Sequence, residues 1–439
     1  MNNSKVPKHE TYWIETYGCQ MNTAESNALE QALQAAGLRP ANSALEADCA
    51  ILNTCSVRKT AENRIWGRIG FFQHVKQHRP LTLMVTGCMA ERLGDQLMQD
   101  APAVDHVLGT NDKQRIAAIL SGASDEREPN YQFTQSYYKE GQFSSFVPIM
   151  NGCNNFCAYC IVPYVRGREV SRDPQSIYDE VSRLESSQVK QITLLGQNVN
   201  SYQYQSGHEI IRFPELLSHI AAKCSTIRWI RFESPHPKDF SPELVDLIGK
   251  EPKIARHLHI PLQSGSTKIL GLMNRRYTAE SFIRLIGDLR ASDPSLTFTT
   301  DVMVGFPQET EEDFNETLAL MKEVRFLEAF MYYFNPREGT KAVELAGQIP
   351  ADIRLERLSR LIEFQRKITA EEKQKRVGSI ADVLVEQPSR RDPSSYLART
   401  EQNDMVVFDQ KGSVRPGEIV RLKLTGLKGS TFVGRFLEE

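Results

Sequence analysis

Between about residues 11 and 120, short apolar runs alternate with amphipathic segments. Residues 12–19, 49–55, 81–88 and 105–110 are compact apolar and β-branched runs typical of strands. Apolar residues at helical spacing fill the intervals, and Gly37 suits the position just beyond the end of the first helix. Strand–helix alternation of this kind predicts an α/β fold with a parallel, doubly wound sheet.

Two further sections follow. From about residue 140 to 372, six strand patterns are each followed by a helical pattern, at residues 144–150, 189–196, 226–234, 257–262, 296–306 and 326–334. Six βα units are two short of a full (β/α)8 barrel, so we expect a partial, open barrel. Beyond about residue 376, short strand patterns separated by Gly, Pro and Ser predict a small all-β barrel. We divide the chain into domains at 10–125, 139–372 and 373–439, with a polar linker at 121–132.

Composition narrows the class of protein. Apolar residues make up 40% and charged residues 25% of the 439 residues, which excludes a disordered, collagen-like or coiled-coil chain. No apolar run approaches the ~20 residues that span a bilayer, and the first residues lack the apolar core of a signal peptide. We therefore expect a cytoplasmic protein with no membrane partner. The net charge of −2 means that a nucleic-acid partner would need a local basic patch.

The strongest local signal is a C-x3-C-x2-C motif formed by Cys153, Cys157 and Cys160, directly after the first strand of the expected barrel. Three thiolates in one loop can surround a common metal centre. A structural zinc ion would need a fourth ligand, and the next Cys or His is His208. Three ligands on a [4Fe–4S] cluster would instead leave one iron open to a small molecule. This spacing directly after the first strand of a βα series resembles the radical S-adenosylmethionine superfamily, and the resemblance favours the cluster over zinc.

Three other cysteines share a position rather than a motif. Cys19, Cys55 and Cys88 each end a predicted strand of the N-terminal sheet. The carboxyl ends of parallel strands share one edge, so these three can converge on one point. Cysteine is also a common buried residue, and that alternative suits Cys49 and Cys224. The repeated terminal placement favours a second metal cluster.

Two three-cysteine sets in this order resemble the radical S-adenosylmethionine (SAM) methylthiotransferase family. The resemblance covers nearly the whole chain, including a C-terminal TRAM-like barrel. The motifs similar to the MiaB branch, which modifies isopentenylated adenosine in tRNA, are TYGCQMN at 16–22, NTCSVR at 53–58, GCNNFCAYCIVPYVRGREVSR at 152–172, LLGQNVNSY at 194–202 and LQSGS at 262–266. One departure is GFPQET at 305–310, where the family usually has GFPGET. Glutamine adopts a positive φ less easily than glycine, so the departure bears only on the local conformation of that loop.

The resemblance implies two cofactor sites. Cys153, Cys157 and Cys160 would hold a [4Fe–4S] cluster that binds SAM and, with one electron, yields a 5′-deoxyadenosyl radical. Cys19, Cys55 and Cys88 would hold a second [4Fe–4S] cluster that carries the inserted sulfur.

The reaction that the resemblance implies adds a 2-methylthio group to N6-isopentenyladenosine next to the anticodon of tRNA. An unactivated aromatic C–H bond has no useful acidity, so ordinary acid–base residues cannot do this work. The implied partners are the tRNA, a flavodoxin- or ferredoxin-like one-electron reductant and a sulfur source. Alternatives are methylthiotransfer to threonylcarbamoyladenosine in tRNA or to a ribosomal protein, and, from another class, a zinc-binding RNA scaffold.

The remaining candidates lie near the expected active face. Contacts to SAM or substrate are expected from residues in the cysteine loop and after barrel strands: Tyr159, Gly196, Gln197, Asn198, Glu233, Ser234 and Gln263, with Asp301 as a substrate anchor. Tyr159 could instead only pack, and Gly196 and Asn198 could only build a turn. Phosphate contacts are expected from Arg166, Arg168, Arg172, Arg275, Arg276, Arg390 and Arg391, against the alternative of a solvated surface or an ordinary salt bridge.

Overall fold

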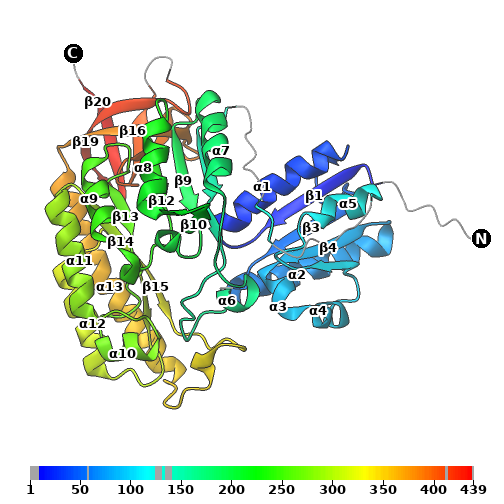
Figure 1. Ribbon diagram of the computed structural model, residues 1–439, viewed down its shortest axis with the longest axis horizontal. Coiled ribbons are helices and arrows are strands. Elements are labelled where there is room, and N and C mark those ends of the chain that lie inside the picture. The colour runs from blue at the N-terminus through cyan, green and yellow to red at the C-terminus, as the bar shows by residue number, and fades with distance from the viewer. Residues whose placement is uncertain (1–8, 57–58, 124–130, 134–140, 411–413, 438–439) are drawn as a thin grey trace, which may run out of the picture.

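The computed structural model describes residues 9–56, 59–123, 131–133, 141–410 and 414–437. Its three sections follow one another along the chain and meet in space (Figure 1). The N-terminal section, blue to cyan, lies beside the central section in green and yellow, and the C-terminal strands, orange to red, pack at one end of the central section.

The N-terminal section is the parallel, doubly wound sheet that the alternation predicts. Its strands are β1 (Thr11–Thr16), β2 (Arg39–Pro40), β3 (Cys49–Thr54), β4 (Thr82–Gly87) and β5 (His106–Leu108), in the order β2-β1-β3-β4-β5. Its helices are α1 (Gln20–Ala35), α2 (Lys59–His78), α3 (Cys88–Leu93), α4 (Asp95–Asp100) and α5 (Arg115–Ser121). Alternate residues of β3 pack on opposite faces: Ala50 and Leu52 in one apolar cluster, Cys49 and Ile51 in the other. Cys49 is therefore a core residue.

The central section is an open barrel of six parallel strands. They are β6 (Ser144–Pro148), β9 (Gln191–Leu195), β12 (Trp229–Phe232), β13 (His257–His259), β14 (Thr297–Val304) and β15 (Glu328–Tyr333). They pair as two three-stranded sheets, β12-β9-β6 and β13-β14-β15. The helices that follow them are α7 (Pro174–Ser186), α8 (Phe213–Lys223), α9 (Pro242–Lys250), α10 (Thr267–Leu272), α11 (Ala279–Ser292), α12 (Glu311–Val324) and α13 (Ala351–Arg376). The expectation of a partial barrel is confirmed.

Shorter elements complete this section. They are the β7–β8 ribbon (Met150–Asn151 with Val170–Ser171), α6 (Val162–Val165), the β10–β11 hairpin (Gln203–Ser206 with Glu209–Arg212) and three 3-10 turns (Val199–Ser201, Pro237–Asp239 and Lys341–Val343).

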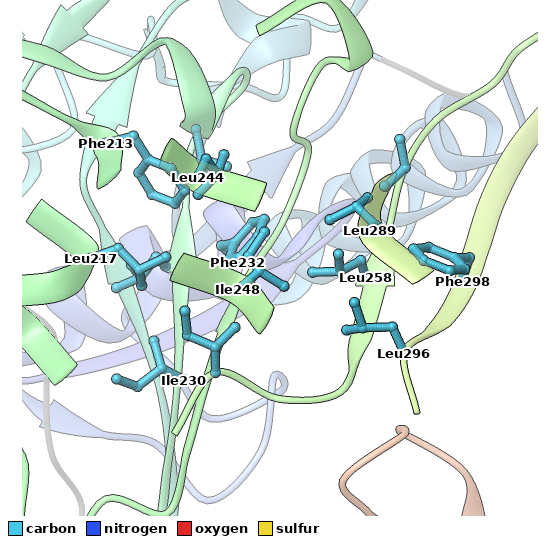
Figure 2. Packing of buried hydrophobic residues seen from close by; sticks show 14 of the residues in the cluster. Phe213, Leu217, Ile230, Phe232, Leu244, Ile248, Leu258, Leu289, Leu296 and Phe298 are labelled. Carbon is cyan, nitrogen blue, oxygen red and sulfur yellow. The ribbon is translucent and has the colours of Figure 1, made fainter. Parts of the chain in front are cut away.

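The main apolar core lies between the barrel strands and their outer helices. Figure 2 shows side chains of α8 and α9, such as Phe213 and Leu244, packed around Ile230 and Phe232 of β12. Fully burying one such side chain contributes about 1.5–3 kcal/mol. This packing fixes the strands from outside and leaves their other faces to line the interior of the barrel.

The C-terminal section is a closed five-stranded barrel. Its strands are β16 (Ile380–Pro388), β17 (Ser395–Thr400), β18 (Met405–Asp409), β19 (Ile419–Lys428) and β20 (Thr431–Phe436), closed in the order β16-β17-β18-β20-β19. The predicted boundary after residue 372 falls inside α13, which runs to Arg376. Residues 125 and 139 and most of the expected linker lie outside the described residues, so the domain limits stay predictions. No helix in the described ranges is long and apolar enough to cross a membrane.

Asp313 organises the LQSGS loop against α12. Its carboxylate accepts a hydrogen bond of 2.7 Å from Ser266 Oγ and pairs with Lys268, while Thr310 donates to it from the backbone. Burial alone would raise the pKa of Asp313, but Lys268 and the Thr310 amide outweigh it and hold that pKa at about 2.

The lowered pKa of Asp313 predicts an acid-labile contribution to stability. Because the unfolded carboxyl titrates near pH 4, the contribution is complete above that pH and is lost as the pH falls toward 2. It amounts to about 2 kcal/mol. Chemical denaturation of wild type and Asp313→Asn at pH 7 and pH 3 should show a smaller difference at pH 3. An equal difference at both values would contradict the assignment.

Candidate active site

Cys19, Cys55 and Cys88 stand at the carboxyl ends of three neighbouring strands, β1, β3 and β4. Two glycines bring these ends close together. A Cβ at Gly18, whose φ is +113°, would lie 2.7 Å from Cys55 Sγ, and a Cβ at Gly87, at φ +93°, would lie 2.5 Å from the β3 backbone. Only glycine fits such positions. The three cysteines therefore gather on one edge of the sheet.

The second cysteine set lies in one loop between β7 and α6. Cys153 and Cys157 are buried and Cys160 is partly exposed. The loop is closed by hydrogen bonds from Cys160 N to Cys157 O at 2.9 Å and from Cys153 N to Gly167 O at 3.1 Å. Burial raises the pKa of the Cys153 thiol to about 11 and that of Cys160 to about 12. Such thiols ionise readily only when a metal or cation stabilises the thiolate.

The cysteine loop fits an iron–sulfur cluster better than a single ion. Among the described residues, no three His, Cys, Asp or Glu side chains are placed to hold one metal ion. A zinc ion would need its ligands about 2.3 Å from one point. A cubane cluster spreads its thiolates over separate irons, and three cysteines leave one iron free.

The two cysteine sets lie on facing surfaces. Cys88 packs in one buried cluster with Ile161 and Val165. Ile161 directly follows Cys160, and Val165 ends α6. The edge of the N-terminal sheet thus meets the loop of the second set.

Arg166 joins these surfaces and does not face RNA, so its predicted phosphate contact is wrong. It is buried, with Nη1 donating to Glu25 Oε1 at 2.8 Å and Nη2 donating to Asn22 Oδ1 at 2.9 Å, both on α1. Glu25 also pairs with Lys113. Burial would raise the pKa of Glu25, but Arg166 and Lys113 outweigh it and hold that pKa at about 2. The carboxylate therefore stays charged and fastens α1 to the barrel.

The predicted phosphate contacts of two other arginines are wrong for the same reason, because both side chains are buried. Arg172 is 2% exposed and pairs with Glu180 at 2.7 Å. Arg275 is also buried, with Nη1 3.5 Å from Cys157 Sγ. Neither guanidinium can reach a phosphate at the surface.

The other four predicted phosphate contacts remain available. Arg276, Arg390 and Arg391 are exposed. Arg168 is also exposed and stacks over the Phe156 ring, 4.4 Å from its centroid. These four stay proposals for phosphate binding.

The residues that follow β9 brace the cysteine loop. Gln197 Oε1 accepts a hydrogen bond from Gly152 N at 2.5 Å. Gly196 leaves no room for a Cβ, whose nearest neighbour would be 2.4 Å away. Asn198 Nδ2 donates to Asp239 at 2.9 Å, but its buried Oδ1 has no partner among the described residues. Gly196 and Gln197 thus build the turn, whereas Asn198 offers a free acceptor to a ligand.

Tyr159 packs against an apolar cluster that includes Ala158, Met273 and Phe334. Burial is the main cause that raises its pKa well above the ordinary range, so the hydroxyl stays protonated. These contacts favour packing over stacking on a bound adenine.

A polar cavity of about 330 Å³ lies inside the open barrel, and we call it the barrel cavity. It is lined by residues of all three sections: Gln20, Glu233, Ser234, His257, His259, Thr299, Asp301, Leu327, Glu328, Phe330, Tyr332, Gln402, Asn403 and Asp404. Strand residues contribute at every second position, because their neighbours Leu258, Val302 and Met331 pack outward in the main core. The predicted Glu233, Ser234 and Asp301 belong to this lining.

Charge in the barrel cavity centres on a histidine–carboxylate pair. His259 Nε2 lies 3.0 Å from Asp301 Oδ2. Burial would lower the pKa of His259, but Asp301 and Glu233 outweigh it and raise that pKa. Burial also raises the pKa of Glu233. The cavity thus combines carboxylates, a histidine that gains a proton readily, and an exposed Phe330 ring 5.6 Å from His259.

Backbone strain marks two predicted residues near the barrel cavity. Ser234 and Gln263 have φ of +60° and +68°, an uncommon conformation for residues with side chains. Gln263 continues the barrel ladder, since its N donates to Asp301 O at 2.8 Å and its O accepts from Met303 N at 2.8 Å.

Sequence reasoning missed several residues of this site. The missed residues are His257, His259, Phe330 and Tyr332. Polar and aromatic residues at alternate positions of their strands could have indicated them. Choosing which strand face turns inward, however, required the register of each strand in the barrel. Another missed contact is the pair between Arg337 of the central section and Glu62 of α2 at 2.8 Å.

Comparison with known proteins places these features in a class. The model of the Radical SAM superfamily matches residues 147–321, the TRAM domain model matches 374–436, and the model described as Uncharacterized protein family UPF0004 matches 11–109. The radical SAM methyltransferase TsrM from Kitasatospora setae shares the fold at a TM-score of 0.56 and 14% identity, over 76% of this chain and 74% of that one. The cobalamin-dependent SAM radical enzyme OxsB is similar at 0.52 and 11%, over 82% and 56%. The fold and the cysteine loop define a radical SAM enzyme, which uses an iron–sulfur cluster and SAM.

Full-length relatives define the family. The tRNA-2-methylthio-N(6)-dimethylallyladenosine synthase of Treponema pallidum is 44% identical over 98% of this chain and 99% of its own length. The enzyme of the same name from Moorella thermoacetica is 41% identical over 96% and 97%. The chain belongs to this family of radical SAM methylthiotransferases.

Proposed function

We propose that this chain adds a 2-methylthio group to N6-isopentenyladenosine next to the anticodon of tRNA. The observation that carries the proposal is the barrel cavity, because all three sections line it. Gln20, the neighbour of Cys19, lies at its wall together with barrel strands and Gln402–Asp404 of the C-terminal barrel. A base bound in the cavity would have the candidate sulfur site, the barrel and an RNA-binding module around it.

Two clusters would divide the chemistry. Cys153, Cys157 and Cys160 would hold one [4Fe–4S] cluster, which when bound supplies the electron that cleaves SAM. Cys19, Cys55 and Cys88 would hold the second. The chain's own part is to keep the two thiolate sets facing each other, through the Cys88 contact with α6 and the Glu25–Arg166 pair.

The lining of the barrel cavity suits a neutral base. The carboxylates of Glu233 and Asp301 can accept hydrogen bonds from the N–H groups of a base, and they would repel a phosphate. Phe330 is 53% exposed on the edge strand β15 and presents a stacking surface. Bases of RNA loops are commonly splayed out and stacked on aromatic side chains.

Replacing Phe330 with alanine tests the cavity. We expect kcat/KM for tRNA to fall roughly 5- to 150-fold, because stacking of a base on an aromatic ring contributes about 1–3 kcal/mol. SAM cleavage without tRNA should persist. The matched control is Tyr333→Ala, since Tyr333 is 39% exposed on the same strand but does not line the cavity. Equal losses in both variants would remove the cavity from the substrate site.

The proposed partners follow from this reaction. They are the tRNA, a one-electron reductant of the flavodoxin or ferredoxin kind and a source of sulfur, all in the cytoplasm. The C-terminal barrel would capture the RNA, with Arg390 and Arg391 near phosphates.

A further inference from the structure

Arg275 is a buried cation that touches a cysteine of the second set. Its Nη1 lies 3.5 Å from Cys157 Sγ, its Nη2 donates to Pro261 O at 3.0 Å, and its Nε donates to Tyr277 Oη at 3.2 Å. Arg275 is 6% exposed, so water screens its charge little.

The segment around Arg275 is built to hold it there. Asn274 and Arg276 on either side have φ of +58° and +57°. Asn274 Nδ2 donates to the backbone oxygens of Asn155 and Phe156 in the cysteine loop, at 3.1 and 2.9 Å. Two strained residues and these hydrogen bonds fix the guanidinium against the loop.

Arg275 lacks the partner that such a charge normally has. Of the four other buried arginines among the described residues, three pair with carboxylates: Arg166 with Glu25, Arg172 with Glu180 and Arg357 with Glu309. The fourth, Arg231, forms no ion pair with a described residue but interacts electrostatically with Glu233 and Glu401. Among the described residues, no carboxylate forms an ion pair with Arg275, whose contacts are the Tyr277 hydroxyl, the Pro261 carbonyl and the Cys157 sulfur. A buried charge is costly unless it is paired, so this guanidinium calls for an anion at the cysteine loop.

We propose that Arg275 is the counter-ion of the iron–sulfur cluster on Cys153, Cys157 and Cys160, and that it raises the cluster's reduction potential. It acts through the thiolates and is a positioning residue. The inference rests on the assignment of a cluster to these cysteines. One-electron reduction adds negative charge to the cluster, and a fixed cation with a hydrogen bond to a ligand sulfur stabilises the reduced form.

The test is a redox titration of the full-length protein in which Cys19, Cys55 and Cys88 are all replaced with alanine. In this parent protein only the cluster on Cys153, Cys157 and Cys160 is observed. The reduced cluster is followed by electron paramagnetic resonance, without SAM. Arg275→Gln should disfavour reduction at least tenfold, which is a potential lower by 59 mV for a one-electron couple. Arg275→Lys should stay within threefold of the parent, because it keeps the charge. Arg276→Gln removes an adjacent charge that is exposed and screened by water, so it should leave the potential within threefold of the parent.

The outcomes separate electrostatics from structure. An Arg275→Gln cluster with the parent's potential overturns the proposal, as does an equal shift in Arg276→Gln. If Arg275→Gln takes up no iron while Arg275→Lys takes it up at the parent's potential, charge at this position is required and the proposal stands. If neither variant takes up iron, the role is structural and the proposal is wrong. If a variant with alanine at Cys153, Cys157 and Cys160 bound as much iron as the wild type, the assignment of a cluster to these cysteines would itself be wrong.

Discussion

A triple variant with alanine in place of Cys153, Cys157 and Cys160 should no longer cleave SAM and should bind half as much iron. Anaerobically reconstituted wild type is expected to hold about eight irons, as two cubane clusters. The cysteine loop contains no other described cysteine that could replace these three ligands, so the SAM-binding iron is lost. Iron analysis and chromatographic detection of 5′-deoxyadenosine measure the two effects.

Alanine at Cys19, Cys55 and Cys88 should give the complementary result. The bound iron again falls by half and the methylthio product disappears. SAM is still cleaved, because the cysteine loop is intact. Cys49→Ala is the matched control: Cys49 is buried in β3 among apolar residues and should bind no iron. Either triple variant retaining all its iron would show that the ligand sets are misassigned.

The second large effect is expected at the Glu25 pair. Glu25→Gln keeps the shape of the side chain but leaves Arg166 and Lys113 buried without their carboxylate. Removing one partner from a buried ion pair costs about 3–5 kcal/mol. Chemical denaturation should show this loss, and methylthiotransfer should fall more than SAM cleavage because α1 is no longer fastened to the barrel.

Glu46→Gln serves as the control for Glu25→Gln. Glu46 is an exposed carboxylate of the same section, so its loss should change the free energy of unfolding by less than about 0.5 kcal/mol. A Glu25→Gln protein as stable as Glu46→Gln would mean that the buried pair does not hold the interface.

The sequence predicts those parts of the fold and site that depend on local pattern. Cys19, Cys55 and Cys88 could be placed together because each ends a strand, and parallel strands end on one edge. The partial barrel followed from the number of strand–helix units. Both inferences need only the position of a residue within its own element.

The rest depended on contacts between distant segments. Arg166 was assigned to RNA because nothing local shows that Glu25, far earlier in the chain, pairs with it. The barrel cavity could not be derived because its lining depends on which face of each strand turns inward. The loop GFPQET shows a different limit: Gln308 adopts φ +67° despite its side chain, with its N–H donating to Gly347 O at 2.8 Å. A tertiary contact there holds a conformation that local preference disfavours.

The most direct test of the proposed reaction compares three substrates in one assay. Full-length, anaerobically reconstituted protein is given SAM, a reductant and sulfide, with isopentenylated tRNA, the same tRNA without the isopentenyl group, or tRNA that carries threonylcarbamoyladenosine. Mass spectrometry of the digested nucleosides then identifies the product. We expect 2-methylthio-N6-isopentenyladenosine from the first tRNA and no methylthio product from the other two. An unchanged first tRNA, or equal modification of the threonylcarbamoyl tRNA, would contradict this expectation.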